Sequence, residues 1–268
     1  MHRLAIALVA GALLVTPVAA QDFSRGYEAY KNGDYAAALG AFRALAEDRD
    51  AQARYYLGLM YERGLGVPPD EAKAMMWFRS AAELGSVYAQ YNLGQRHLNY
   101  ILGRLVRQDD AQAMKWFRLA AAQEHKESQH SLGFMYAHGL GATQDHAQAA
   151  MWYRKAAGNG LANAQYDLGL MYYEGQGVPQ DYDEALKWYG KAAEQGFSSA
   201  QHEFGLMYKD GKGVPRDTVR AYTLLDLAAG NGGLFSGDIR DALAGKMSPG
   251  QIAEARRMAR EWMEKHGR

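Results

Sequence analysis

Histidine imidazoles are the first side chains in this sequence that could do chemistry. His125, His130, His138 and His146 fall in one short stretch, and imidazole nitrogens bind zinc or copper and exchange protons near neutral pH. No two of these histidines are four positions apart, the spacing that places two metal ligands on one face of a helix. The pattern leaves open both a metal site and solvent-facing histidines, and we expect no metal and no cofactor.

Motifs for hydrolytic catalysis are missing from the sequence. No serine is followed three positions later by a lysine, no Gly-x-Ser-x-Gly elbow occurs, and His202-Glu203 lacks the second histidine of a zinc protease motif. The absence of cysteine removes thiolate catalysis, disulfides and cysteine metal sites. Gly64-Leu65-Gly66 and Gly211-Lys212-Gly213 lack the full spacing of nucleotide-binding loops. We therefore predict no catalytic residues and a protein that is not an enzyme.

The composition is that of a charge-balanced chain with enough apolar residues for a core. Among 268 residues, 48% are hydrophobic, and 30 Lys+Arg balance 30 Asp+Glu. This apolar content excludes a disordered chain. Binding to phosphates needs a surplus of basic residues, so we expect no nucleic-acid partner.

The first twenty residues have the layout of a secretory signal peptide. Met1-His2-Arg3 is positively charged, residues 4–15 are uncharged and mostly apolar, and Val18-Ala19-Ala20 supplies the small residues of a cleavage site. We predict cleavage after Ala20 and a periplasmic or secreted bacterial protein whose mature form does not span a membrane. The alternative is an uncleaved anchor, although a membrane span needs about 20 apolar residues.

Five repeated units must position any site in this chain. A two-residue motif recurs at steps of 36, 39, 36 and 36 residues, as Leu57-Gly58, Leu93-Gly94, Leu132-Gly133, Leu168-Gly169 and Phe204-Gly205. A fixed period near 36 residues indicates a solenoid, in which no unit can bury its apolar face alone.

Each unit is predicted to form two helices. The second helix of the fourth unit carries one apolar stripe at helical spacing, formed by Ala185, Trp188, Tyr189, Ala192 and Ala193. Asp181 is its expected N-cap, with Glu184 placed to complete a capping box. The corresponding caps of the other repeats are expected at Asp70, Asp109, Asp145 and Asp217. Gly169 lies inside the first helix, where glycine costs about 1 kcal/mol relative to alanine. We therefore expect a neighbouring helix backbone to approach this position too closely for a Cβ atom.

The fourth unit resembles a Sel-1-like repeat, a 36-residue relative of the tetratricopeptide repeat. The resemblance rests on Tyr-Asp-Leu-Gly-Leu-Met-Tyr at 166–172, Gly-Gln-Gly-Val-Pro-Gln-Asp at 175–181, and the stripe at 185–193. It implies an all-α, right-handed α/α solenoid that serves as a protein-binding scaffold, and it carries over no catalytic residues. Bacterial members of the family often work in the cell envelope or in signalling.

The repeats divide the chain into four parts. We expect a signal peptide at 1–20, a tetratricopeptide-like hairpin at 21–50, five repeats within 51–232 and C-terminal capping helices at 233–268. The five repeats are expected at 51–86, 87–125, 126–161, 162–197 and 198–232. Ser248 is predicted to cap the last helix, with Gln251 completing a capping box.

The second repeat contains three extra residues within 98–105. Insertions in repeats map to loops on one face, often the binding face, so Tyr100, Ile101 and Leu102 form a candidate partner-specific loop. Neutral drift in a tolerant connection is the alternative.

The candidate binding surface is the face of the first helices opposite their core stripe, which stacked repeats turn into a concave groove. Tyrosines on this face could anchor a partner, because their rings bury area and keep a hydroxyl for hydrogen bonding. Packing of Tyr55, Tyr91 and Tyr166 between repeats is the open alternative. The predicted residues are Tyr55, Leu59, Glu62, Tyr91, Gln95, His130, Phe134, Tyr166, Leu170, Tyr173, His202, Leu206 and Lys209.

Two functions are compatible with these features. The first is a monomeric, non-catalytic scaffold that binds protein or peptide partners on its concave face and regulates a cell-envelope or signalling process. The alternative is a cell-envelope hydrolase or a factor that binds peptidoglycan or a β-lactam, which would need a pocket with convergent acid and base groups.

Overall fold

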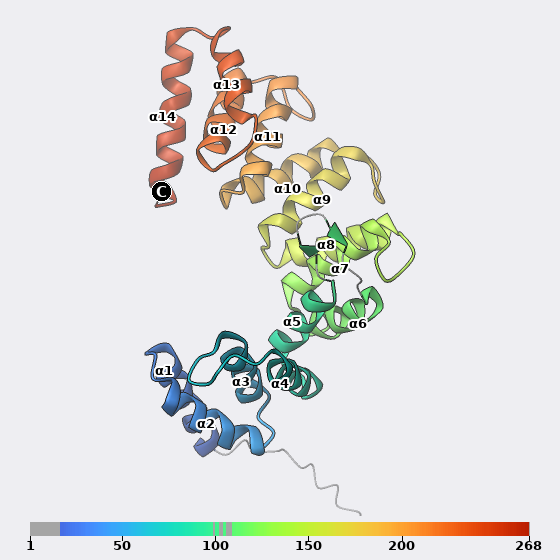
Figure 1. Cartoon of the computed structure of the whole chain (residues 1–268). Helices are drawn as coiled ribbons and strands as arrows, with labels where there is room; N and C mark the ends of the chain where they lie inside the picture. The colour runs from blue at the N-terminus through green and yellow to red at the C-terminus, as the bar shows by residue number, and fades with distance from the viewer. Residues whose placement is uncertain (1–16, 99, 102–103, 106–108, 268) are drawn as a thin grey trace, which may run out of the picture. The chain divides into compact units, whose positions relative to one another are not determined.

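The computed structural model describes residues 17–98, 100–101, 104–105 and 109–267, and these form helices joined by short turns (Figure 1). Two short strands, β1 (Tyr100–Ile101) and β2 (Arg104–Leu105), lie between α5 and α6. The predicted all-α repeat fold is confirmed. The helices are α1 (Pro17–Lys31), α2 (Tyr35–Glu47), α3 (Ala51–Arg63), α4 (Glu71–Glu83), α5 (Val87–Leu98), α6 (Asp110–Ala121), α7 (Lys126–His138), α8 (His146–Gly158), α9 (Ala162–Glu174), α10 (Tyr182–Glu194), α11 (Ser198–Asp210), α12 (Thr218–Gly230), α13 (Ser236–Ala244) and α14 (Pro249–Lys265).

The chain forms two compact units, residues 1–93 and 94–268. In the N-terminal unit, α1 packs on α2 and α3 packs on α4. In the C-terminal unit the paired helices are α7 with α8, α9 with α10, and α11 with α12, and α12 also packs against α13 and α14. Among the described residues, no helix combines the length and the apolar character needed to cross a bilayer.

Aspartate side chains begin the second helix of every repeat. At the start of α8, Asp145 Oδ1 accepts a hydrogen bond from the Gln148 backbone N–H at 2.9 Å. This satisfies one of the N–H groups that a helix N-terminus leaves without a partner. The predicted caps are confirmed for Asp70, Asp109, Asp145, Asp181 and Asp217.

The two predicted capping boxes have different outcomes. Ser248 and Gln251 form theirs at the start of α14. The box at Asp181 is wrong, because the Asp181 N–H donates to Tyr172 O at 2.9 Å. The Glu184 side chain instead accepts hydrogen bonds from Lys187 Nζ and Trp188 Nε1.

The recurrent helical glycine leaves room for a side chain of the same repeat. A Cβ on Gly169 would lie 2.8 Å from Cδ1 of Tyr189. The close approach predicted for this position is confirmed, but the approaching group is a ring rather than a helix backbone. The same relationship joins Gly58 to Phe78, Gly94 to Phe117 and Gly133 to Tyr153, and Gly205 instead meets Leu225 and the Ala221 carbonyl.

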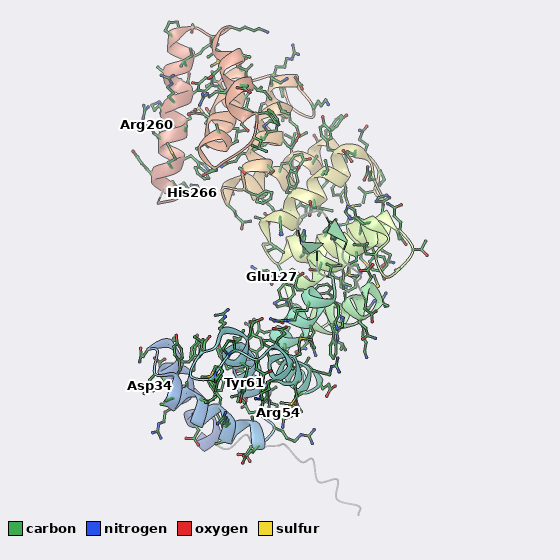
Figure 2. The ribbon with its side chains drawn as sticks, in the orientation of Figure 1. Asp34, Arg54, Tyr61, Glu127, Arg260 and His266 are labelled. Atoms are coloured by element: carbon green, nitrogen blue, oxygen red, sulfur yellow. The ribbon has the colours of Figure 1, made fainter. Side chains whose placement is uncertain are left out.

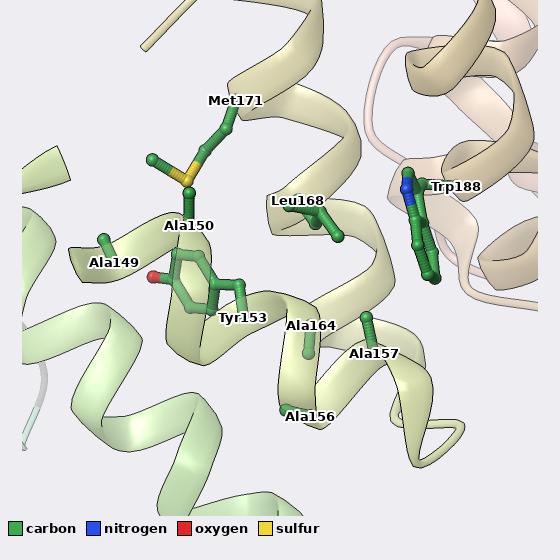
Figure 3. Packing of buried hydrophobic residues seen from close by; sticks show 9 residues of the cluster. All are labelled: Ala149, Ala150, Tyr153, Ala156, Ala157, Ala164, Leu168, Met171 and Trp188. Carbon is green, nitrogen blue, oxygen red and sulfur yellow. The ribbon is translucent and has the colours of Figure 1, made fainter. Parts of the chain in front are cut away.

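Alanine-rich packing joins the third and fourth repeats in one hydrophobic cluster. Figure 3 shows Tyr153, Leu168 and Met171 filling the space between α8 and α9, with Trp188 of α10 packed on the same cluster. Small residues let these helices approach closely, and the larger side chains interdigitate between them. The alanines of this cluster are Ala149, Ala150, Ala156, Ala157 and Ala164.

The second repeat replaces a glycine turn with a small antiparallel ladder. β1 pairs with β2 through Tyr100↔Leu105. The regular repeats carry a glycine at the position of Leu105; Gly141 has a φ of 69°, and a Cβ there would lie 2.5 Å from Asp110 O. Leucine rarely adopts this left-handed backbone conformation, so the connection takes another path. Ile101 of the predicted variant loop also lies in β1, whereas Leu102 lies outside the described residues.

Candidate binding surface

In the N-terminal unit, the predicted surface residues lie on α3 and α5. Tyr55, Glu62 and Tyr91 are half-buried. Leu59 is only 8% exposed, so its assignment to the binding surface is wrong. Leu59 belongs to the buried side of α3 and offers a partner almost no area.

In the C-terminal unit, the predicted residues come from successive first helices. Gln95, near the end of α5, is exposed, and the others are half-buried. α7 supplies His130 and Phe134, α9 supplies Tyr166, Leu170 and Tyr173, and α11 supplies His202, Leu206 and Lys209. We call the face formed by these α7, α9 and α11 residues the first-helix face.

Tyr55 packs between two repeats and Tyr166 packs on rings of its own repeat, and both stay partly exposed. The Tyr55 ring lies 5.8 Å from Phe78 of its own repeat and 6.0 Å from Tyr88 of the next. Tyr166 lies 5.7 Å from Tyr189 and 5.5 Å from Phe197 by the same ring-centroid measure. Each ring therefore has a packing role, and its exposed part is available for contact.

Polar contacts link the first helices across the repeat boundaries. His130 Nε2 of α7 lies 2.7 Å from Asp167 Oδ2 of α9. Lys212, in the turn after α11, donates to the Tyr173 hydroxyl of α9. These contacts place α7, α9 and the end of α11 next to one another.

Glu203 on α11 is a half-buried carboxyl with charged neighbours. Burial raises the pKa of its carboxyl, and the negative charge of Glu174 raises it further, against the opposing effects of His202 and Lys212. A carboxyl that is partly removed from water and keeps its proton more tightly than usual is a candidate for ligand contact.

A glutamine ladder joins the repeats and was not foreseen from the sequence. Gln165, 5% exposed, donates from Nε2 to Ala157 O of the preceding repeat at 3.1 Å and accepts from Gln195 Nε2 at 2.7 Å. The signal was present, because glutamine occupies this position in four repeats. The equivalent donors are Gln90 to Ala82, Gln129 to Ala121 and Gln201 to Ala193.

In the first repeat an arginine takes the place of this glutamine. Arg54 donates from Nε and Nη2 to Ala46 O at 3.0 and 2.7 Å. Arg54 and Tyr61 are both labelled in the N-terminal unit in Figure 2. The Tyr61 hydroxyl accepts from Arg43 Nη2 at 3.0 Å, a second bond between neighbouring hairpins.

The clustered histidines meet different partners. His138 and His146 line a cavity of about 320 Å³ beside α7–α9, together with Tyr153 and Asp167. The His138 Nδ1 is hydrogen-bonded to Phe134 O at 2.9 Å. Among the described residues, no group of three or more His, Asp or Glu side chains could hold a metal ion.

The repeat geometry agrees with one known family. The Sel1 repeat model matches residues 51–86, 87–125, 126–161, 162–197 and 198–233. The chain belongs to the Sel1 repeat family. Sel1 repeats generally mediate protein interactions, and Sel1-repeat proteins are generally non-catalytic scaffolds.

Solved Sel1 structures resemble this chain over most of its length. A Sel1 repeat protein from Oxalobacter formigenes is 31% identical with a TM-score of 0.73, covering 91% of this chain and 95% of that one. c5321, a protective antigen present in uropathogenic Escherichia coli strains, is 27% identical with a TM-score of 0.58, covering 92% of this chain and 61% of that one. These likenesses confirm the Sel1 repeat fold.

A viral relative shares only part of the sequence. The sel1-like repeat-containing protein L21 of Acanthamoeba polyphaga mimivirus is 41% identical over 54 residues. The match covers 20% of this chain and spans 10% of the length of that curated relative. It therefore supports the repeat assignment alone.

Proposed function

We propose that this protein is an exported, non-catalytic Sel1 scaffold that binds a protein or peptide segment on the first-helix face. The observation that carries the proposal is that this face holds half-buried apolar and polar side chains from three successive helices within one compact unit. Leu170 and Leu206 supply apolar anchors, and Tyr173 supplies a ring with a hydroxyl. Such mixtures are typical of surfaces where a few anchors dominate binding.

Export and a role in regulating a cell-envelope or signalling process belong to the same proposal. They are supported by the signal-peptide layout of residues 1–20 and by the family's usual role as a scaffold. We propose the periplasm or the external medium as the location of the mature chain, acting as a monomer.

Capture of partners from an envelope extract tests the binding face. Leu170→Ala should weaken capture by about fivefold or more, because truncating a central apolar anchor typically costs about 1 kcal/mol or more. Leu119→Ala is the matched control, since Leu119 is 43% exposed on α6, a second helix of a repeat. Equal capture by wild type and Leu170→Ala would reject the first-helix face as the site.

The N-terminus of the protein recovered from cells tests export. Mass spectrometry of the N-terminal peptide should find Gln21 as the first residue, in the periplasmic or secreted fraction. Recovery of a chain that still begins at Met1 would reject cleavage.

Turnover assays test the absence of catalysis. We expect the purified protein to leave nitrocefin and purified sacculi unchanged. Hydrolysis of either substrate would overturn the scaffold and favour the envelope hydrolase.

A further inference from the structure

Successive repeats place a carboxylate at the same position with different surroundings. Asp167 in α9 and Glu203 in α11 are 36 residues apart. Asp167 Oδ2 lies 2.7 Å from His130 Nε2 on the preceding first helix. Tyr166 stands 36 residues after His130, so the imidazole that meets Asp167 is replaced by a phenol where Glu203 lies. The repeats themselves therefore show how a carboxylate at this position is satisfied, and that Glu203 lacks the equivalent group.

The Glu203 side chain makes no hydrogen bond or ion pair with the residues that the structure describes. The basic groups near it are engaged elsewhere. His202 Nδ1 is hydrogen-bonded to Ser236 Oγ of α13 at 2.9 Å. Lys212 donates to the Tyr173 hydroxyl, and its Nζ lies 4.6 Å from the centre of that ring. Glu203 thus keeps its hydrogen-bonding capacity for a group from outside the chain.

A buried hydroxyl without a partner among the described residues lies on the neighbouring helix α10. Tyr189 is fully buried, and its hydroxyl has no hydrogen-bond partner in the described part of the chain. Burial raises the pKa of this hydroxyl, and among its neighbours Glu203 raises it most, followed by Tyr166 and Glu174. The Tyr166 ring lies 5.7 Å from the Tyr189 ring. Two carboxylates, an unpartnered hydroxyl and a half-exposed ring therefore converge between α9, α10 and α11.

We propose that Glu203 receives a lysine or arginine side chain of the bound segment, with Glu174 adding negative charge and Tyr166 flanking the cation. The proposal rests on the proposed function, because it specifies the partner chemistry of the first-helix face. Ammonium and guanidinium groups fit this place because they donate charge-assisted hydrogen bonds to carboxylates. They also gain from an aromatic ring beside them.

A pair of peptides that differ only in this charge tests the proposal. The probes are acetyl-Ala-Leu-Lys-Leu-Ala-amide and the same peptide with glutamine in place of lysine, titrated by NMR against the full chain. We expect the lysine peptide to bind wild type about tenfold more tightly than the glutamine peptide. Glu203→Gln should abolish this preference. Glu194→Gln, an exposed glutamate on α10, should retain it.

A second measurement separates binding from folding. The pKa of the Glu203 carboxyl should fall when the lysine peptide is added, because a bound cation favours the ionised form. Glu174 of α9, His202 of α11 and Lys212 of the following turn face the same carboxyl, so their signals are followed in the same titration. Circular dichroism of Glu203→Gln checks that the variant stays folded.

The outcomes distinguish this proposal from the binding face itself. Equal affinity of the two peptides, or a preference that survives Glu203→Gln in a folded variant, would overturn the cation site. If Leu170→Ala still weakens the binding of both peptides, the first-helix face is retained as the binding surface and only the cation site is rejected. A lysine peptide that does not bind wild type also overturns the cation site, and partner capture then judges the face separately.

Discussion

A Cβ atom placed on Gly133 would lie 2.5 Å from Cδ1 of Tyr153, closer than real Cβ atoms approach such neighbours. The two residues belong to α7 and α8, the two helices of the third repeat. The absent side chain lets the ring pack directly against the α7 backbone. The free-energy cost of a glycine inside a helix is therefore offset by packing of the paired helix.

Gly133→Ala should lower the free energy of unfolding by up to about 2 kcal/mol. Overpacking costs about 1 to 3 kcal/mol, and the better helix propensity of alanine returns about 1 kcal/mol. Gly158→Ala is the control, because Gly158 ends α8 and a Cβ added there would have no neighbouring atom within 4 Å. Urea denaturation should show a loss for the first variant and none for the second. Equal stabilities would mean that Tyr153 can move aside at little cost.

Gln165→Leu should lower the free energy of unfolding by about 1 to 3 kcal/mol. The substitution removes two hydrogen bonds between neighbouring helices, the one that Gln165 donates to Ala157 O and the one that it accepts from Gln195, and each is typically worth about 0.5 to 1.5 kcal/mol. Gln180→Leu removes an exposed hydrogen bond to Tyr173 O, and should change stability by less than about 0.5 kcal/mol. A similar loss of unfolding free energy in both variants would show that the glutamine ladder does not specifically stabilise the contact between repeats.

The stability of the third repeat should decrease as the pH falls below about 6.5, the ordinary pKa of histidine. His125 Nδ1 accepts the Ser128 N–H at 3.3 Å and caps α7. Burial lowers the pKa of His125, against a smaller opposing effect of Glu127. The unfolded chain therefore binds the proton first, and stability is lost on acidification.

His125→Asn keeps a capping side chain that does not titrate. Between pH 7 and pH 5, the Tm measured by thermal unfolding should fall less for this variant than for wild type.

Tyr189→Phe should raise the free energy of unfolding by about 1 kcal/mol, because it removes a buried hydroxyl without a partner in the part of the chain that the structure describes. Tyr172→Phe is the matched control and should lose about 0.5 kcal/mol, since the Tyr172 hydroxyl accepts from Arg154 at 2.8 Å. Burial raises the pKa of Tyr189, so the unfolded chain ionises first above about pH 10. The stability of Tyr189→Phe relative to wild type should therefore grow at alkaline pH. A Tyr189→Phe variant that is less stable than wild type at pH 7 would show that the hydroxyl has a partner.

Glu203→Gln should stabilise the free protein at pH 7. Burial raises the pKa of the Glu203 carboxyl, so stability is highest when this group is protonated and decreases as the pH rises through its folded-state pKa. The gain from the substitution should disappear below about pH 4, where the wild-type carboxyl is neutral in both states. Guanidinium denaturation at the two pH values measures whether Glu203→Gln raises or lowers the free energy of unfolding. A variant that is less stable at pH 7 would mean that the charged form of Glu203 is satisfied within the chain.

Local features of the chain could be predicted because they depend on near neighbours. Asp145 accepts from an N–H three residues away, and Ser248 and Gln251 close their box within one turn. The glycine at 169 was correctly expected to lie against a close neighbour. The identity of that neighbour could not be predicted, because the choice between a helix backbone and the Tyr189 ring depends on how the two helices pack.

The sequence by itself determined the helical repeat, its period and its caps, because periodic apolar positions and local hydrogen bonds specify helices within one repeat. The tertiary structure decided that Leu59 is buried, that Gln165 binds the preceding repeat and that His130 meets Asp167. These relationships join residues on different helices, and small differences in helix rotation decide which side chains meet. The surroundings of Glu203 have the same origin, since only the packing of α9, α10 and α11 brings its neighbours together.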